Sequence, residues 1–332
     1  METLKKIFFK VCTVTLYAFA VCAILIQPCA GADDPAAFPS KPITLVVPYG
    51  AGGASDMIAR KIGELAAKNL NQPVVVEIKA GGAGVIATTA VAKAASDGYT
   101  LLLASDSPLV YVPHQRSVPY NTKEDFTYII EVAEFSFPFC VRADSRFKTF
   151  KDFIEEARKN PGKLTYQSQG PKSAGHVQTE YLFSLEKVKV KHVPGAGVAE
   201  VAIQLLGGHV DGGIAAGLAG QIKAGTIRPL VILGSKRNPH TPDVPTSYEL
   251  GYKHGAPFGA RFGIIGPKGL HPKITKKLHG AFKEAFEDAS YVELIDNMQE
   301  TYLYRDSEAY KQITVQDYEQ VKKIFKDLNL AN

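Results

Sequence analysis

The feature that most constrains the fold of this chain is a glycine-rich turn, Pro48–Asp56, between a strand pattern and a helix pattern. Before it, the β-branched run Ile43–Val47 predicts a buried strand. After it, apolar residues recur at helical spacing from Ile58, so Ser55 or Asp56 is expected to cap that helix. A strand that turns through glycines into a helix directs free backbone N–H groups at one spot, where the helix dipole favours negative charge. The turn therefore predicts an anion site.

The first 32 residues predict export. Lysines near the start precede a mostly apolar stretch, Val11–Ile26, and small residues of the A-x-A type end at Ala32. The stretch is short for a membrane span, which needs about 20 residues. A signal peptide cleaved after Ala32 is thus favoured over an anchor, and Cys29 leaves a lipoprotein as the alternative. We expect a periplasmic mature chain.

Cysteine content and charge exclude several function classes. Cys140 is the only cysteine after the leader, so no intrachain disulfide and no cysteine-based zinc site can form. The eight histidines are scattered without metal-ligand spacing, and no metal or cofactor is expected. The net charge of +5 is dispersed, which makes nucleic acid an unexpected partner. We expect a monomer with enough residues for two domains.

Strand, glycine turn and helix follow one another in two series, one early in the chain and one from about residue 164 onward. This repetition predicts a mainly parallel sheet covered by helices. Two α/β lobes facing each other across a cleft satisfy the pattern, with ligands beyond the carboxyl ends of the strands. The predicted lobe 1 comprises 33–138 and 237–332, and the predicted lobe 2 comprises 139–236.

Two helices have specific local signals. The pair Thr149 and Asp152 has the spacing of a capping box, which predicts a helix start at residue 150. A second helix is expected to begin near Pro272, and its apolar residues fall on one face. This face comprises Ile274, Leu278, Ala281, Phe282, Ala285 and Phe286.

Short motifs recur through nearly the whole mature chain, and their order and spacing together are specific. They are Val47–Gly53, Gly81–Gly84, Asp97–Leu102, Ser168-x-Gly170, Val193-Pro194, Leu205–Gly208, Pro245-Thr246 and Gly266–Gly269. In this order they resemble the substrate-binding proteins of tripartite tricarboxylate transporters, which are Bug-type periplasmic receptors. The resemblance implies a two-lobed periplasmic-binding-protein fold, the Venus flytrap of type II-like arrangement, with a ligand cleft between the lobes.

The resemblance also implies a receptor that is not an enzyme. Such a protein captures a small organic carboxylate between its lobes for uptake through the membrane permease components of a tripartite transporter. Backbone N–H groups suit this task, because charge-assisted bonds in a desolvated cleft are strong. The positions that match the family's binding loops in the first lobe are Tyr49, Gly50, Ala51, Gly52, Gly53, Ser55, Asp56, Gly82, Ala83, Gly84, Ala87, Thr88, Ser105, Asp106 and Ser107. Those in the second lobe are Ser168, Gly170, Lys172, Ser173, His176, Gly195, Ala196, Gly197 and Ala199.

Three departures from the family pattern bear on the ligand. Gly195-Ala196-Gly197 stands where the family commonly has Tyr-Lys-Gly, and Gln204 stands where it often has an acid. Loss of the acid removes a partner for a ligand amino group. Lys172 replaces a glycine and, if it faces the cleft, could pair with a second carboxylate. The resulting hypothesis is a ligand with two or more carboxylates and no free amine, and its alternative is a solvated surface lysine.

Aromatic residues leave a second question about the ligand open. Tyr49, Phe135, Phe137, Phe258 and Phe262 either shape a pocket for an aromatic acid or belong to the core. The alternative to a transport receptor is a sensor component that presents a carboxylate to a membrane signalling protein such as a sensor kinase.

An exported α/β enzyme is the remote alternative. A dinucleotide site at Gly50-x-Gly52 with Glu77 lacks the third glycine. A hydrolase built on Ser173 and His176 lacks the G-x-S-x-G elbow and a third member.

Overall fold

The computed structural model describes residues 35, 37–195, 197–234, 236–252 and 259–330. Residues 39–332 form one compact unit. The predicted signal peptide, its cleavage after Ala32, Ala196 and Phe258 lie outside the described residues. Within the described residues, no helix has both the length and the apolar character to cross a membrane.

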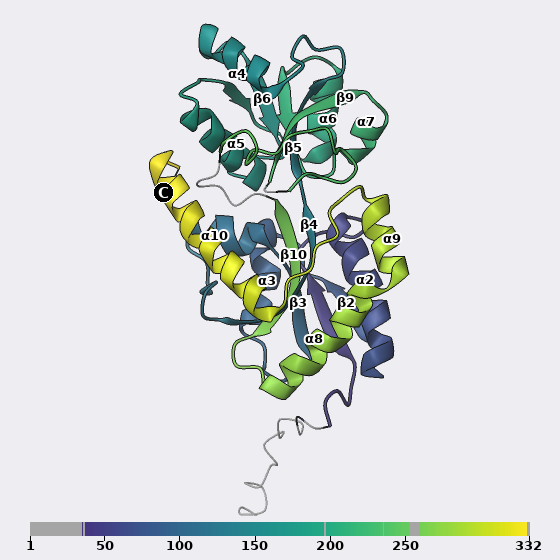
Figure 1. Cartoon of the computed structure of the whole chain (residues 1–332). Helices are drawn as coiled ribbons and strands as arrows, with labels where there is room; N and C mark the ends of the chain where they lie inside the picture. The colour runs from purple at the N-terminus through teal and green to yellow at the C-terminus, as the bar shows by residue number, and fades with distance from the viewer. Residues whose placement is uncertain (1–34, 36, 196, 235, 253–258, 331–332) are drawn as a thin grey trace, which may run out of the picture. The chain divides into compact units, whose positions relative to one another are not determined.

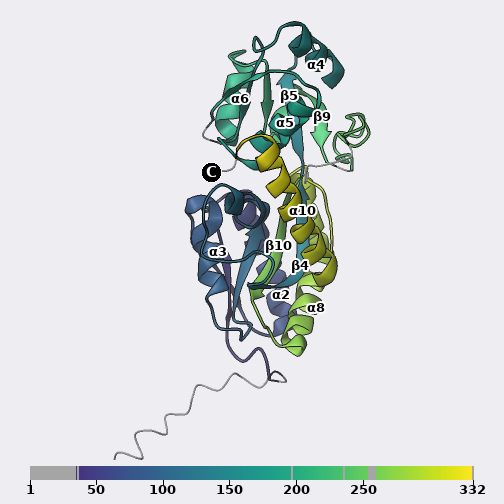
Figure 2. The same ribbon diagram turned by 90° about the vertical axis from the view of Figure 1, so that its left-hand side faces the viewer.

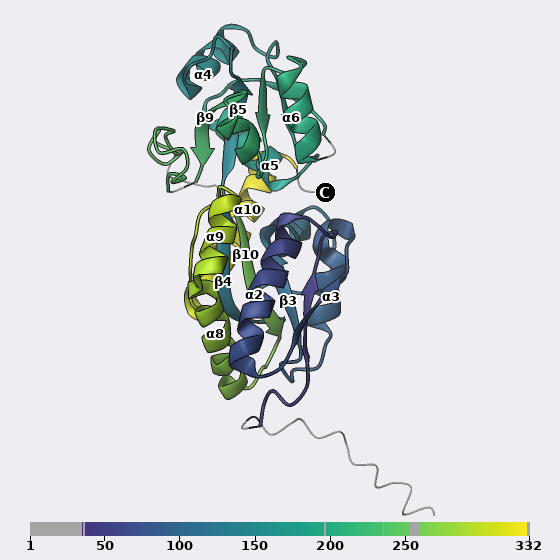
Figure 3. The same cartoon turned by 90° about the vertical axis from the view of Figure 1, so that its right-hand side faces the viewer.

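The first sheet contains five strands in the order β2-β1-β3-β10-β4 (Figure 1). Strand β1 runs parallel to β2 and β3, whereas β10 runs antiparallel to β3 and β4. Helix α8 packs against α2 and β4, and α10 packs against β4 (Figure 3). The bounds of these elements are β1 Ile43–Val47, β2 Val74–Ile78, β3 Thr100–Ser105, β4 Phe126–Phe135, β10 Ala260–Pro267, α2 Ala54–Leu70, α3 Val85–Ala92, α8 Pro272–Glu287, α9 Ala289–Asn297 and α10 Ser307–Asp327. Short helical turns lie at η1 Gly82–Gly84, η2 Ser107–Tyr111 and η3 Val112–His114.

The second sheet also has five strands, in the order β7-β6-β8-β5-β9. Strand β6 runs parallel to β7 and β8, whereas β5 runs antiparallel to β8 and β9. Its elements are β5 Phe137–Arg142, β6 Thr165–Ser168, β7 Lys191–Val193, β8 Gly212–Ile214, β9 Ile227–Leu233, α4 Phe150–Lys159, α5 Ala174–Leu185, α6 Val198–Leu206 and α7 Ala219–Lys223. The predicted α/β fold with two lobes, each built on its own sheet and helices, is therefore confirmed.

The prediction of mainly parallel pairing was wrong, because each sheet is mixed. Two of the four pairings in each sheet are parallel and two are antiparallel. Strand β10 enters the first sheet after the chain has completed the second sheet, so no βαβ crossover fixes its direction. Strand β5 follows β4 after a single residue, Ser136, and carries the chain from one sheet into the other (Figure 2). The change of sheet thus falls between Phe135 and Phe137, while the lobe bounds given above stay a prediction.

Local signals account for several helices. Helix α4 has the predicted capping box, in which Thr149 accepts from the Asp152 N–H at 3.1 Å and Asp152 accepts from the Thr149 N–H at 2.8 Å. All six residues predicted for the apolar face of α8 are buried. The capping box therefore correctly predicted the start of α4, and the apolar periodicity correctly predicted the buried face of α8.

The predicted cap of α2 was wrong. The N-cap is Gly53, and the helix begins at Ala54. Asp56 lies in the first turn, where its Oδ2 accepts from the Gly52 N–H at 2.9 Å and its Oδ1 pairs with Arg60 at 2.8 Å. The carboxylate folds back onto the glycine turn, so it rigidifies the turn that the helix leaves.

Candidate functional site

A cavity of about 510 Å³ is lined by residues that belong to both sheets and their loops. This volume falls in the range of roughly 300–1,000 Å³ that small-molecule sites occupy. From the first sheet and its connections come Tyr49, Ala54, Ser105, Asp106, Ser107, Phe135, Ala260 and Phe262. From the second come Phe137, Gln169, Ser173, Ala174, Val198, Ala216 and Gly217.

Three helices begin at this cavity. Ala54, Ala174 and Val198 are the first residues of α2, α5 and α6, and all three line it. The first N–H groups of a helix have no intrahelical acceptor, and the dipole makes that end positive. The arrangement therefore directs three sets of backbone donors at one space, which suits an anion.

Side chains on the wall add hydroxyl and amide groups. Tyr49 and Ser105 share a hydrogen bond of 2.8 Å between their hydroxyl groups, and burial raises the pKa of Tyr49, so the phenol keeps its proton. Gln169 Oε1 accepts from the Ala216 N–H at 3.3 Å, which orients the amide so that its NH₂ group can donate to a ligand. Ser173 caps α5 by accepting from the His176 N–H at 3.4 Å.

Asp106 belongs to a buried ion-pair group. Its Oδ2 accepts from the Arg261 backbone N–H at 2.9 Å, and its Oδ1 lies 3.4 Å from the Arg261 guanidinium. The same guanidinium also contacts Asp317 of α10. Asp106 therefore ties the end of β3 to β10 and α10, and its oxygens are already partnered.

Three phenylalanine rings form an aromatic wall, which we define as Phe135, Phe137 and Phe262. They are 5 %, 3 % and 8 % exposed, and all line the cavity. The rings of Phe135 and Phe262 meet edge to face, with centroids 5.1 Å apart and planes at 65°. These rings come from the end of β4, the start of β5 and the start of β10, so the wall lies where the chain passes between the sheets. Tyr49 also lines the cavity, so four of the five aromatic residues singled out in the sequence meet there.

The structure gathers some of the predicted site residues at the cavity. Tyr49, Ser105, Asp106, Ser107 and Ser173 line it. Others lie in the turns beside it: Gly50, Ala51, Gly52 and Gly53 precede α2, and Ser55 is buried in its first turn. Gly82, Ala83 and Gly84 form η1, while Ala87 and Thr88 are buried in α3, where Thr88 Oγ1 donates to the Gly84 carbonyl at 2.9 Å. Their role as ligand contacts stays a prediction.

Around the second sheet, Ser168 and His176 have partners within the protein. Ser168 Oγ lies 2.8 Å from His192 Nε2. His176 Nδ1 accepts from the Lys172 N–H at 2.7 Å, and its ring stacks on His192 with centroids 3.9 Å apart. Burial lowers the pKa of His176 to about 4, so the ring is neutral near pH 7. His176 thus orders the turn before α5 rather than supplying a positive charge.

Lys172 is not among the described residues that line the cavity. Its backbone has φ +58°, and its carbonyl accepts from Gln115 Nε2 at 2.8 Å. Gly170 lies in the same turn, and Gly195, Gly197 and Ala199 lie at or near the start of α6, also outside the described lining. The hypothesis of a second carboxylate partner at Lys172 gains no support from the lining.

The sequence did not single out several residues of the lining. Ala54, Ala174 and Val198 could have been found from the rule that a helix start after a glycine or serine cap faces a ligand. Ala216 and Gly217 follow the short strand β8, which has no hydrophobic alternation to mark it because it begins Gly212-Gly213. No group of His, Cys, Asp and Glu in the described part of the chain could hold a metal ion.

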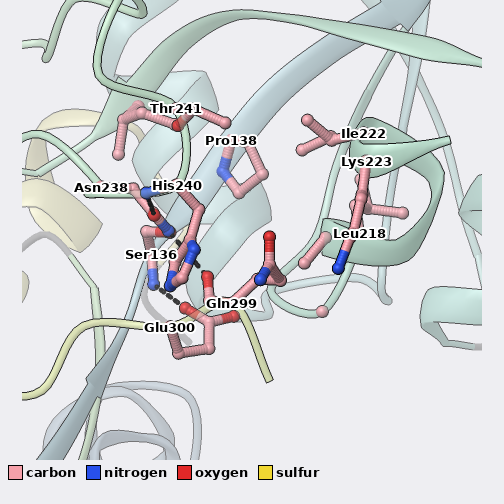
Figure 4. Close-up of a pocket in the computed structure, with 13 residues that line it drawn as sticks. Ser136, Pro138, Leu218, Ile222, Lys223, Asn238, His240, Thr241, Gln299 and Glu300 are labelled. Carbon is pink, nitrogen blue, oxygen red and sulfur yellow. Dashed lines mark hydrogen bonds between the residues drawn. The ribbon is translucent and has the colours of Figure 1, made fainter. Parts of the chain in front are cut away.

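A second, smaller pocket of about 120 Å³ is lined in part by Ser136, the residue that joins β4 to β5, which we call the β4–β5 crossing (Figure 4). Ser136, Asn238, His240 and Glu300 face it. Glu300 Oε2 accepts from the Ser136 N–H at 3.0 Å, and burial raises the pKa of Glu300 to about 8. Asn238 Nδ2 donates to Ser136 Oγ at 3.1 Å. We call this the back pocket.

Comparisons with known proteins identify the family. Residues 58–330 match the model of the tripartite tricarboxylate transporter family receptor, TctC. The chain is 38 % identical over 295 residues to a Cupriavidus necator protein, "UPF0065 protein in gbd 5'region", with 89 % of each chain covered. It is 35 % identical over 263 residues to BugT of Bordetella pertussis, with 77 % of this chain and 79 % of BugT covered.

Solved structures agree with this result. A TctC solute-binding protein from Polaromonas has 26 % identity and a TM-score of 0.79, with 87 % of this chain and 99 % of that chain covered. A Rhodopseudomonas palustris protein solved with adipate has 26 % identity and a TM-score of 0.75, with 89 % and 99 % covered. MatC of the same organism, solved with bound malate, has 26 % identity and a TM-score of 0.71, with 86 % and 99 % covered. Family members are periplasmic solute-binding proteins with the Venus-flytrap fold. The protein therefore belongs to the TctC family of tripartite tricarboxylate transporter receptors.

Proposed function

We propose that this protein is an exported receptor that closes its two lobes on a small organic carboxylate and delivers it to the permease of a tripartite tricarboxylate-type transporter. The observation that carries the proposal is the meeting of three helix N-termini at one cavity lined from both sheets. The adipate and malate bound by two structural neighbours support a carboxylate as the ligand class. Lysines before an apolar stretch and small residues up to Ala32 support cleavage there.

The geometry favours capture over catalysis. Ser173 is engaged as the cap of α5, His176 accepts from a backbone N–H, and Asp106 is held by Arg261. The residues with the chemistry of a hydrolase are thus used to shape the turns around the cavity. Backbone donors that hold a carboxylate need no proton transfer, and they release the ligand unchanged when the lobes open.

The test uses protein recovered from the periplasm of an expression host. Its first residue should be Asp33. Thermal unfolding is then measured in the presence of mono-, di-, tri- and aromatic carboxylates. At least one of them should raise the Tm of the protein by mass action. Small-angle scattering should then give a smaller radius of gyration with that ligand, and mass spectrometry should recover it unaltered. A chemically changed ligand, or no stabilisation by any carboxylate, would refute the receptor function.

A further inference from the structure

We propose that the cavity selects an aryl monocarboxylate, which is a ligand with one carboxylate at one end and a flat, apolar, ring-bearing body. This inference rests on the proposed function, because it takes a carboxylate as the ligand and asks which kind fits. The evidence is the composition of the cavity lining, which combines three phenylalanine rings with three helix starts and, among the described lining residues, no cationic side chain.

The apolar part of the lining is the aromatic wall. Its three rings are almost fully buried by the protein, yet each contributes to the cavity surface. Phe135 and Phe262 are already set edge to face at 5.1 Å, a geometry in which a further ring can pack edge to face or offset against either one. Ring pairs of this kind contribute beyond the area that they bury. A flat ligand ring uses the wall better than a flexible alkyl chain does.

The polar part of the lining comes from other elements. The first residues of α2, α5 and α6 line the cavity, and Ser173 and Gln169 add a hydroxyl and an amide group. In contrast, the wall comes from strands β4, β5 and β10. A ligand that satisfies both sets of groups has its carboxylate at the helix starts and its body against the rings.

A second carboxylate has no suitable place at the wall. Asp106 is the one charged side chain among the described lining residues, and it is acidic and already bound to Arg261. A carboxylate pushed against the rings would lose its hydration without gaining a cation, which is costly. The cavity thus favours one charged end over two.

Isothermal calorimetry with benzoate, hexanoate and adipate tests the inference on the native protein. Benzoate should bind at least tenfold more tightly than adipate and several-fold more tightly than hexanoate. Equal or tighter binding of adipate would overturn the inference and leave the proposed function intact. If a carboxylate of the wider panel binds but benzoate does not, the inference also fails alone. If no carboxylate binds, the proposed function fails with it.

A pair of matched variants tests the role of the wall. Phe262→Leu removes one ring of the edge-to-face pair, and Phe147→Leu removes one ring of a similar pair with Phe153, at 5.1 Å and 67°, outside the cavity. Phe262→Leu should lower the affinity for benzoate about fivefold to tenfold and that for hexanoate less than twofold. Phe147→Leu should change neither. Equal losses for both ligands in Phe262→Leu would overturn the role of the ring, and if that variant does not fold, Phe137→Leu provides the same comparison.

Discussion

Replacement of Glu300 by glutamine should make the stability of the protein less dependent on pH. The unfolding free energy of Glu300→Gln minus that of the wild type should be larger at pH 8 than at pH 5. The carboxyl group is buried in the back pocket and accepts one hydrogen bond from the Ser136 N–H. Burial raises its pKa from 4.5 to about 8. The folded protein therefore keeps the proton between these values, whereas the unfolded chain has released it.

The sign and size follow from proton linkage. A group whose pKa is raised on folding contributes stability at low pH and loses it as the pH rises through the window from about 4.5 to about 8. One pKa unit corresponds to about 1.4 kcal/mol, so the wild type should lose up to about 4 kcal/mol of unfolding free energy from this group by pH 8. Glutamine keeps an acceptor for the Ser136 N–H and does not ionise, so Glu300→Gln should not show this loss.

The assay is urea unfolding at pH 5, 6.5 and 8 for the wild type and Glu300→Gln. The difference in unfolding free energy between the two proteins should grow by about 2–4 kcal/mol from pH 5 to pH 8. Glu131, whose pKa burial raises to about 7, titrates in both proteins and cancels in this difference. Glu293→Gln, at an exposed site on α9, is the control, and its difference in unfolding free energy from the wild type should not change with pH. A flat difference for Glu300→Gln as well would refute the reasoning.

Two further predictions concern the helix starts at the cavity. Gly52→Val places a side chain at φ +78° in open space, and the control Gly225→Val does so at φ +68° away from the cavity. Both variants should lose about 1–2 kcal/mol of unfolding free energy, measured with urea. Only Gly52→Val should also weaken carboxylate binding, by at least tenfold in calorimetry. Unchanged affinity in Gly52→Val would place the carboxylate elsewhere. Ser173→Ala removes the cap of α5 and Thr149→Ala that of α4, so each should cost about 1 kcal/mol, and only Ser173→Ala should also lower ligand affinity. Equal affinity in these two variants would remove Ser173 from the site.

The sequence predicted best those elements whose signals are local. The apolar face of α8 and the capping box of α4 were correct because side-chain spacing within one helix determines both. The start of α2 was misplaced because the Asp56 carboxylate bonds to the turn before the helix rather than capping it. An aspartate near a helix start can cap the helix or bond to the turn before it, and the sequence alone does not distinguish these two geometries.

Long-range pairing could not be predicted from the sequence. Strand β4 was not among the predicted strands. Its two acids, Glu131 and Glu134, have their partner Arg305 far along the chain. The cavity lining likewise depends on residues that are far apart in the sequence. Tyr49, Ser105 and Ser173 were found from motifs, but the apolar lining residues Ala216 and Ala260 are informative only once two sheets bring them together.

The β4–β5 crossing has a practical consequence for detection of the ligand. Phe135 and Phe137 face the ligand cavity, while Ser136 between them faces the back pocket. A dye attached through Lys223→Cys, at the exposed rim of the back pocket, would sense movement of this segment without touching the ligand. Cys140 is buried, and burial raises the pKa of its thiol, so within the described residues a maleimide would label the introduced cysteine selectively. The fold thus lends itself to a fluorescent biosensor in which the ligand and the dye occupy different pockets along the segment that joins β4 to β5.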